Sequence, residues 1–267
     1  MENMVFRFRR FAVRHGRSSM RVGTDAVLIG AWADVAGCRR VLDVGTGCGV
    51  VALMLAQRAP AAQVTGIDVD APSVEEAAAN FAASPWAGRL RAERADVRVY
   101  AECLRAAGRE SSVETVLANG ASEVAGAGDD EEGWKYDCIV SNPPYFTETT
   151  LPPQSSRAVA RHAVAAGLTV GGLLDAVVGL LRRGGRVALV LPAEQEKMAT
   201  EEATARGLLL RRVLAVRTVA WRPARRVLME WQYGGTTTVQ REELLLTDPA
   251  TGGRSAAYAA LTATFYL

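Results

Sequence analysis

The sequence "RVLDVGTGCGVVALMLAQR", residues 40–58, contains the clearest indication of the fold class. It begins with a short apolar run, passes through glycines at 45, 47 and 49, and ends in a longer segment rich in Ala and Leu. Glycine lets the backbone approach a ligand closely, and the start of a helix offers unpaired N–H groups. A glycine triplet alone is also typical of a plain structural turn. Here the order strand, glycine turn, helix predicts a parallel α/β sheet with a ligand at the turn.

The same alternation continues along the chain. Short β-branched runs predict strands, and the longer Ala/Leu-rich runs between them predict helices. The predicted strands are 40–45, 63–68, 90–96, 136–141, 186–192, a stretch within 209–219, and 226–233. The predicted helices are 50–59, 73–84, 96–108, 170–183 and 194–207, with Gly184 and Gly185 as the cap before the fifth strand. The pattern therefore predicts a Rossmann-like α/β fold: a mostly parallel sheet of seven strands with helices on both faces.

Length and composition favour a single large domain. A chain of 267 residues with 49% hydrophobic residues can bury a substantial core. We divide it into an N-terminal basic arm with a first helix packed on the domain, residues 1–34, and the main domain, residues 35–267. Residues 108–133 are rich in Gly, Ser and acids, and we expect a flexible acidic surface insertion there.

The same numbers argue against several classes of protein. The N-terminus lacks the apolar region of a signal peptide, and no apolar run approaches the roughly 18 residues of a membrane span. The four cysteines show no metal-binding spacing and no disulfide framework. We expect a cytoplasmic protein without a metal, and a monomer.

Two acids follow the next two strands. Asp68 ends the strand at 63–68 and Asp96 ends the strand at 90–96, so both belong to the edge of the sheet that carries the glycine turn. Each acid by itself could simply cap the next helix. Together with Asp43, which lies two residues before the first glycine, they predict a nucleoside ligand. Three acids would repel a pyrophosphate but attract S-adenosylmethionine, which carries a sulfonium and an ammonium.

The segment "SNPPY", residues 141–145, ends the predicted fourth strand. The Asn142 side-chain carbonyl and the Pro143 backbone carbonyl can accept both N–H groups of an amino nitrogen and aim its lone pair at a methyl group. Pro144 stiffens the corner, and Tyr145 offers a face for stacking a planar substrate. Asn-Pro is also common in ordinary turns. After a glycine turn with its acids, the segment favours methyl transfer to an amino nitrogen.

These motifs resemble those of the class I S-adenosylmethionine-dependent methyltransferases. The resemblance implies that Asp43 lies near the methionine moiety, Asp68 holds the ribose and Asp96 meets the adenine amine. It implies a sheet whose last strand is antiparallel, with "WRPAR" at 221–225 as the turn before it. The implied cofactor-binding residues are Gly23, Asp25, Asp43, Gly45, Gly47, Gly49, Asp68, Val69, Asp96, Val97 and Asn142. The implied catalytic residues are Asn142, Pro143, Pro144 and Tyr145.

The chain also resembles one narrower family from end to end, the bacterial tRNA (adenine-N6)-methyltransferases that act on valine tRNA. The resemblance is carried by "MRVGTDAVLIGAWA" at 20–33, "SPWAGR" at 84–89, "RRVLMEW" at 225–231 and the ending "YAALTATFYL". It implies N6-methylation of the adenosine 3′ of the anticodon. Alternatives are another amino nitrogen, in an rRNA or DNA base or a release-factor glutamine, and a non-catalytic nucleic-acid-binding module.

Basic residues support a nucleic-acid substrate. Residues 3–24 hold six arginines and no acid, with phenylalanines between them, although a solvated face in an Arg-rich protein would look the same. The proposed RNA-binding residues are Arg7, Arg9, Arg10, Arg14, Arg17, Arg157, Arg161, Arg225 and Arg226. We expect His15 and His162 to be surface or packing residues. We expect Trp86, Trp221 and Trp231 to anchor the core or turns.

Overall fold

The computed structural model describes residues 4–18, 21–118, 133–143, 168–236 and 238–266, without the side chains of 108–118. Four predicted site residues lie outside these ranges: Pro144, Tyr145, Arg157 and Arg161. His162 lies outside them too.

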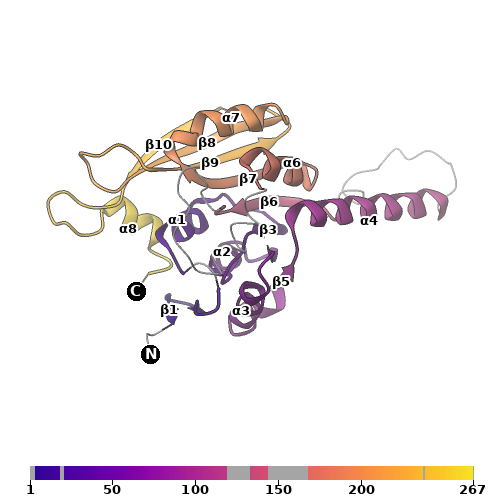
Figure 1. The fold of residues 1–267 in the computed structure, drawn as a ribbon, viewed down its shortest axis with the longest axis horizontal. Coiled ribbons are helices and arrows are strands. Elements are labelled where there is room, and N and C mark those ends of the chain that lie inside the picture. The colour runs from indigo at the N-terminus through magenta and orange to yellow at the C-terminus, as the bar shows by residue number, and fades with distance from the viewer. Residues whose placement is uncertain (1–3, 19–20, 119–132, 144–167, 237, 267) are drawn as a thin grey trace, which may run out of the picture.

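The centre of the molecule is an eight-stranded sheet (Figure 1). Its strands are β3 (Arg40–Val44), β4 (Gln63–Asp68), β5 (Leu90–Arg94), β6 (Tyr136–Ser141), β7 (Leu181–Pro192), β8 (Leu208–Arg217), β9 (Arg226–Tyr233) and β10 (Gln240–Leu245). They lie in the order β10-β8-β9-β7-β6-β3-β4-β5. Only β9 is antiparallel to its neighbours. The predicted antiparallel strand at 226–233, and the turn at 221–225 before it, are confirmed.

The predicted strand count was one too low. β10 pairs in parallel with β8 at the edge of the sheet and was missed. Its sequence, "QREELL", begins with four exposed residues, three of them charged, and only Leu244 is buried. An edge strand with one neighbour and so little buried surface has no alternating apolar pattern for the sequence to show.

Helices cover both faces of the sheet, and each face has its own buried cluster. One face carries α1 (Thr24–Trp32), α2 (Val50–Arg58), α3 (Ala71–Ala82) and α8 (Ala256–Thr262). The other carries α4 (Val97–Ala118), α6 (Val170–Val178) and α7 (Glu196–Thr204). Short 3-10 turns precede β5, at Ala87–Arg89, and α7, at Ala193–Gln195. Side chains alternate along the strands, so Val41 faces the first cluster and Leu42 the second.

The glycine pair before the fifth strand does not cap a helix, and that prediction was wrong. Helix α6 ends at Val178 with Gly179 as its C-cap, and β7 already starts at Leu181. Gly184 lies inside β7 with φ +80°, and a Cβ on Gly185 would lie 3.0 Å from the Tyr136 carbonyl oxygen. The pair therefore lets the long strand bend close to β6.

The helix predicted at 96–108 is longer than expected and includes the first residues of the insertion expected at 108–133. Helix α4 continues to Ala118 and runs away from the body of the molecule (Figure 1). Residues 119–132 lie outside the described ranges. A helix rich in Ala and Glu can extend beyond its packing partners because these residues have high helix propensity.

The N-terminal arginines lie on a folded hairpin. Strands β1 (Val5–Arg7) and β2 (Ala12–Arg14) pair in antiparallel fashion. Phe8, Phe11 and Val13 are buried in the same cluster as α1, α2 and α3. The hairpin is thus part of the core of the fold. Across the described residues, no helix combines the length and hydropathy needed to cross a membrane.

Candidate active site

Strand register brings three predicted residues into one row. Val44 of β3 pairs with Ile67 of β4 on one side and with Ser141 of β6 on the other. The next residue of each strand is therefore Gly45, Asp68 and Asn142, side by side at the carboxyl edge of the sheet. This edge is where ligands bind in open α/β sheets.

The glycine turn adopts a conformation that only glycine takes easily. Gly45, Gly47 and Gly49 have φ values of +73°, +53° and +82°. The N–H groups of Gly45 and Thr46 both donate to the Ile67 carbonyl, at 2.9 and 3.0 Å, so the turn lies across the end of β4. A Cβ on Gly49 would lie 2.5 Å from the Phe81 ring, whereas a Cβ on Gly45 would meet nothing within 4 Å. The turn is packed from below and open above Gly45.

Asp43 supports this turn from inside the protein. It is buried, and its Oδ2 accepts hydrogen bonds from the Thr46 hydroxyl at 2.7 Å and from the Ala52 N–H at 3.2 Å. Burial raises the pKa of the Asp43 carboxyl to about 7, against the two hydrogen bonds that lower it. The structure therefore gives Asp43 a structural task; its predicted place near a methionine moiety stays a prediction.

Asp68 joins the turn to the start of α3. Its Oδ2 accepts from the Gly47 N–H at 2.9 Å and its Oδ1 from the Asp70 N–H at 3.0 Å. Burial raises the pKa of Asp68, and the nearby Asp70 carboxylate raises it further. Asp70 itself caps α3 through the Ser73 N–H. Several carboxylates held close together at an open turn fit a ligand that carries positive charge.

The third predicted acid lies differently. The Asp96 carboxylate accepts from the Arg98 side chain through both oxygens, at 2.9 and 2.5 Å. This hydrogen bonding holds the pKa of Asp96 below its usual value. A ligand amine would have to share or displace Arg98. Of the two neighbouring valines, Val69 is exposed at the end of β4 and Val97 is buried at the start of α4.

Asn142 and Pro143 follow β6, and both are half-buried. Beneath them, the buried Ser141 hydroxyl donates to the Val44 carbonyl at 2.8 Å. This bond fixes the end of β6 against the end of β3, so the position of Asn142 relative to the glycine turn is set by two strands. The structure thereby brings Asn142 together with Gly45 and Asp68.

Helix α1 reaches the same edge with its N-terminus. Asp25 forms an ion pair with Arg226, the first residue of β9, with Nε and Oδ2 3.0 Å apart. Gly23 is the N-cap of α1. The sequence analysis assigned Asp25 to the cofactor and Arg226 to RNA, and did not foresee that they pair. Residues 201 positions apart show no common pattern in a sequence.

Sequence reasoning also missed two buried residues of α3 that hold the chain over the turn. Glu76 accepts the N–H groups of Gly16, Arg17 and Ser18 at 2.8, 3.0 and 2.7 Å. One turn later, Asn80 donates to the carbonyls of Arg14 and Cys48, both at 2.8 Å. We call Glu76 and Asn80 the α3 clasp. A Glu beside another Glu looks like part of a solvated helix face, so only burial reveals it.

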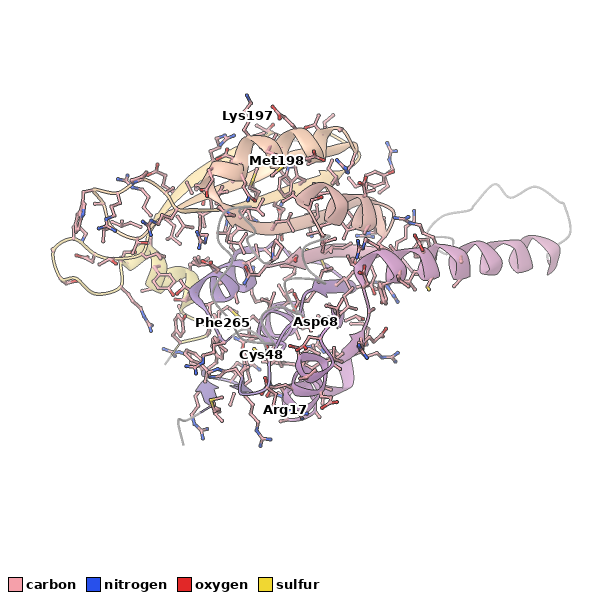
Figure 2. All side chains as sticks on the ribbon, in the orientation of Figure 1. Arg17, Cys48, Asp68, Lys197, Met198 and Phe265 are labelled. Atoms are coloured by element: carbon pink, nitrogen blue, oxygen red, sulfur yellow. The ribbon has the colours of Figure 1, made fainter. Side chains whose placement is uncertain are left out.

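The α3 clasp seats residues 16–18 beside the glycine turn. A Cβ on Gly47 would lie 3.4 Å from the Ser18 hydroxyl. Figure 2 labels Cys48, Asp68 and Arg17 in the same lower part of the molecule, from the turn outward to the surface. This segment forms one wall of the candidate site.

The N-terminal arginines contact different parts of the molecule and do not gather at one point. The Arg10 guanidinium lies 5.6 Å from the centre of the Trp86 ring, just before β5. Arg17 pairs with Glu75, and the Arg9 Nε donates to the Tyr266 carbonyl. The side chains of Arg7, Arg14 and Arg225 are exposed. Trp86 and Trp231 are buried as expected, and His15 is half-buried.

The expectation for Trp221 was wrong. It lies in the turn between β8 and β9 with 74% of its side chain exposed. Trp is rare in sequences and usually packs, so the sequence favoured burial, but the turn extends beyond the sheet. As for metals, the described residues contain no group of three or more His, Cys, Asp or Glu side chains that could hold an ion.

The chain is similar in sequence to known methyltransferases. Residues 41–127 match the family model described as "Methyltransferase domain". The chain is 36% identical over 267 residues to the tRNA1(Val) (adenine(37)-N6)-methyltransferase of Bacteroides fragilis strain YCH46, covering 100% of this chain and 99% of that protein. It is 36% identical over 273 residues to the protein of the same name from Porphyromonas gingivalis, covering 100% and 96%.

Among solved structures, the chain is similar to a predicted O-methyltransferase, Atu636, from Agrobacterium tumefaciens. The TM-score is 0.62 at 16% identity, and the match covers 90% of this chain and 96% of that one. An identity this low supports the Rossmann-like methyltransferase fold alone.

Proposed function

Because the chain belongs to the family of tRNA1(Val) (adenine(37)-N6)-methyltransferases, we propose that it methylates N6 of adenosine 37 in a valine tRNA. The observation that carries this proposal is the row of Gly45, Asp68 and Asn142 across three adjacent strands. The row unites a ligand turn with a side chain suited to hold an amino nitrogen.

S-adenosylmethionine, the cofactor of this family, supplies an electrophilic methyl group. The residues of the site fit it, since the turn is open above Gly45 and carboxylates surround it. We propose that Asp68 binds the ribose hydroxyls and that the open backbone of Gly45 and Gly47 admits the ligand. Val69 supplies an exposed apolar side chain beside the adenine, and Asp96 meets the adenine amine once Arg98 moves aside.

Asn142 and Pro143 orient the substrate. The N6 amine of adenine is a poor nucleophile because its lone pair is delocalised into the ring. Accepting its two N–H groups, through the Asn142 side chain and the Pro143 carbonyl, would direct the lone pair toward the methyl group. An uncharged acceptor suffices, since the amine can lose its proton after the transfer. Pro144 and Tyr145 complete this corner in the proposal.

We propose that arginines at the surface bind the phosphates of the tRNA while the target base is flipped into the site. Arg7, Arg9, Arg10, Arg14, Arg17, Arg157, Arg161, Arg225 and Arg226 remain the candidates. Arg226 already pairs with Asp25, so it would bind RNA only by sharing its guanidinium between that carboxylate and a phosphate. We further propose that the protein works as a monomer in the cytoplasm.

The direct test is transfer of a radiolabelled methyl group from S-adenosylmethionine into separated pools of tRNA, rRNA, DNA and release factors, followed by nucleoside analysis. We expect label in tRNA, recovered as N6-methyladenosine. Label in another pool would replace the substrate assignment but keep the chemistry. Absence of both transfer and cofactor binding would refute an enzymatic function.

A further inference from the structure

The turn that carries Trp221, residues 218–225, projects from the sheet at the same edge as the candidate active site. β9 begins at Arg226, which pairs with Pro192 of β7, and Leu189 of β7 pairs with Ser141 of β6. Strand β9 is thus two strand spacings, about 10 Å, from β6 across the sheet, and the turn extends outward from the end of β9. In Figure 1 it lies with the loop between β10 and α8, on the side away from the extended α4.

The turn is stiffened from within. The Arg217 guanidinium donates to the carbonyls of Arg222, at 2.9 Å, and Ala220. It also lies 3.5 Å from Glu243 of β10. The loop after β10 continues this anchoring, because the Thr247 N–H donates to the Thr218 carbonyl at 3.1 Å. A rigid turn holds an exposed side chain in a fixed direction and lowers the entropy lost on binding.

Three side chains of this turn are unusual together. Trp221 is 74% exposed, the highest value among the large apolar side chains that the structure describes as exposed. Arg222 and Arg225 are exposed beside it, and neither forms an ion pair within the described part of the chain. An indole flanked by two unpaired cations suits a single nucleic-acid strand, whose bases stack and whose phosphates are negative.

We propose that Trp221 is a stacking platform for an unpaired base of the RNA substrate, with Arg222 and Arg225 on the adjacent phosphates. This rests on the proposed function and names the surface that holds the strand next to the flipped adenosine. A protein partner would have little use for two cations without a matching acidic groove, so RNA is the occupant that the charges favour.

The test uses the full-length protein, S-adenosylhomocysteine, and a stem-loop RNA with an adenosine 3′ of the anticodon. Trp221→Ala should weaken RNA binding about tenfold, within the range for loss of one stacked base. The dependence of RNA affinity on salt should be the same in this variant as in the wild type, because no phosphate contact is lost. Trp221→Phe should restore most of the affinity, since a smaller ring still stacks.

Arg222→Ala with Arg225→Ala should also weaken binding, but with a flatter dependence on salt. Met198→Ala is the matched control: Met198, labelled in Figure 2, is an exposed apolar residue on α7 and not part of this turn. It should bind RNA as the wild type does. The Trp fluorescence lost in Trp221→Phe should be the component that RNA quenches.

Failure of this inference and failure of the proposed function give different results. Suppose that the wild type methylates the stem-loop, that Trp221→Ala binds it equally well, and that RNA quenches the Trp fluorescence of both proteins equally. The stacking platform is then wrong, while the proposed function stands. If the wild type neither binds nor methylates any RNA, the proposed function fails first.

Discussion

At the scale of single residues, the candidate site contains some side chains that support the glycine turn and others that are placed to bind a ligand. Asp43 and Asp68 are both acids at strand ends, yet Asp43 is buried under the turn while Asp68 lies half-buried at its rim. Asn142 lies at the same level as Asp68 on a neighbouring strand. The residues proposed to bind ligands and the residue that shapes the turn therefore differ in burial, and mutations can separate their effects.

Asn142→Ala should lower the rate of methyl transfer at least a hundredfold while leaving cofactor affinity near that of the wild type. The reason is that only the alignment of the amine in the transition state is lost. Single-turnover methylation and calorimetric titration with the cofactor measure the two effects. An unchanged rate would remove Asn142 from the mechanism.

Asp43 should make stability depend on pH. Its pKa in the folded protein, about 7, exceeds the value of 3.8 in the unfolded chain. The stability that the protonated Asp43 carboxyl contributes is therefore present at low pH and lost as pH rises through 7. Asp43→Asn keeps an acceptor without the charge. Between pH 5 and pH 8, the free energy of unfolding of the cofactor-free variant should rise by about 2 to 3 kcal/mol relative to that of the wild type.

Urea unfolding of both proteins at the two pH values measures this gain. Glu102→Gln, which removes an exposed carboxylate on α4, controls for the change in net charge. An equal gain in that control would show that the effect is not specific to Asp43.

At the scale of elements, α3 does more than cover the sheet. Its outer residue Glu75 forms an exposed pair with Arg17, whereas its buried residue Glu76 holds three backbone N–H groups of the segment that walls the turn. Adjacent residues of one helix thus have different tasks because their side chains point about 100° apart around the helix axis.

Glu76→Ala should lower the free energy of unfolding by about 3 kcal/mol, since three hydrogen bonds to a buried carboxylate are lost. Amide hydrogens of residues 16–18 should exchange faster. Glu75→Ala is the matched control and should cost less than about 1 kcal/mol, as expected for an exposed ion pair. Equal losses in the two variants would contradict the α3 clasp.

At the scale of the whole molecule, the N-terminal hairpin combines a packing role with a charged surface. Phe8, Phe11 and Val13 belong to the main buried cluster, while the arginines between them face outward. The two roles can be tested apart by removing either the charge or the chain.

Replacing Arg7, Arg9 and Arg10 together with Ala should weaken tRNA binding and reduce the slope of log affinity against log salt by about 2. The matched control replaces Arg39, Arg91 and Arg183, three exposed arginines near the amino ends of strands β3, β5 and β7, opposite the site. An identical slope in the two triple variants would exclude the hairpin as an RNA-binding element.

Deleting residues 1–15 should destabilise the protein by about 5 kcal/mol or more, because three buried apolar side chains leave the core. This is a large share of the stability of an ordinary domain. Thermal and urea unfolding measure the loss, and the triple arginine variant should unfold close to the wild type. A truncated protein of normal stability would show that the hairpin is dispensable to the core.

Features of the fold that depend on residues close together in the chain could be predicted from the sequence. The strand, the three glycines and the helix at 40–58 each follow local conformational rules, and "YDCIVS" at 136–141 was predicted to the residue. The antiparallel strand at 226–233 followed from the family resemblance.

Features that depend on contacts between segments far apart in the sequence became visible in the folded structure alone. It placed Asn142 level with Gly45, paired Asp25 with Arg226, buried Glu76 and left Trp221 in water. It also added β10 to an edge where few residues are buried. The physical reason is that local propensity fixes backbone shape, whereas burial and charge pairing come from segments that meet only after the chain has folded.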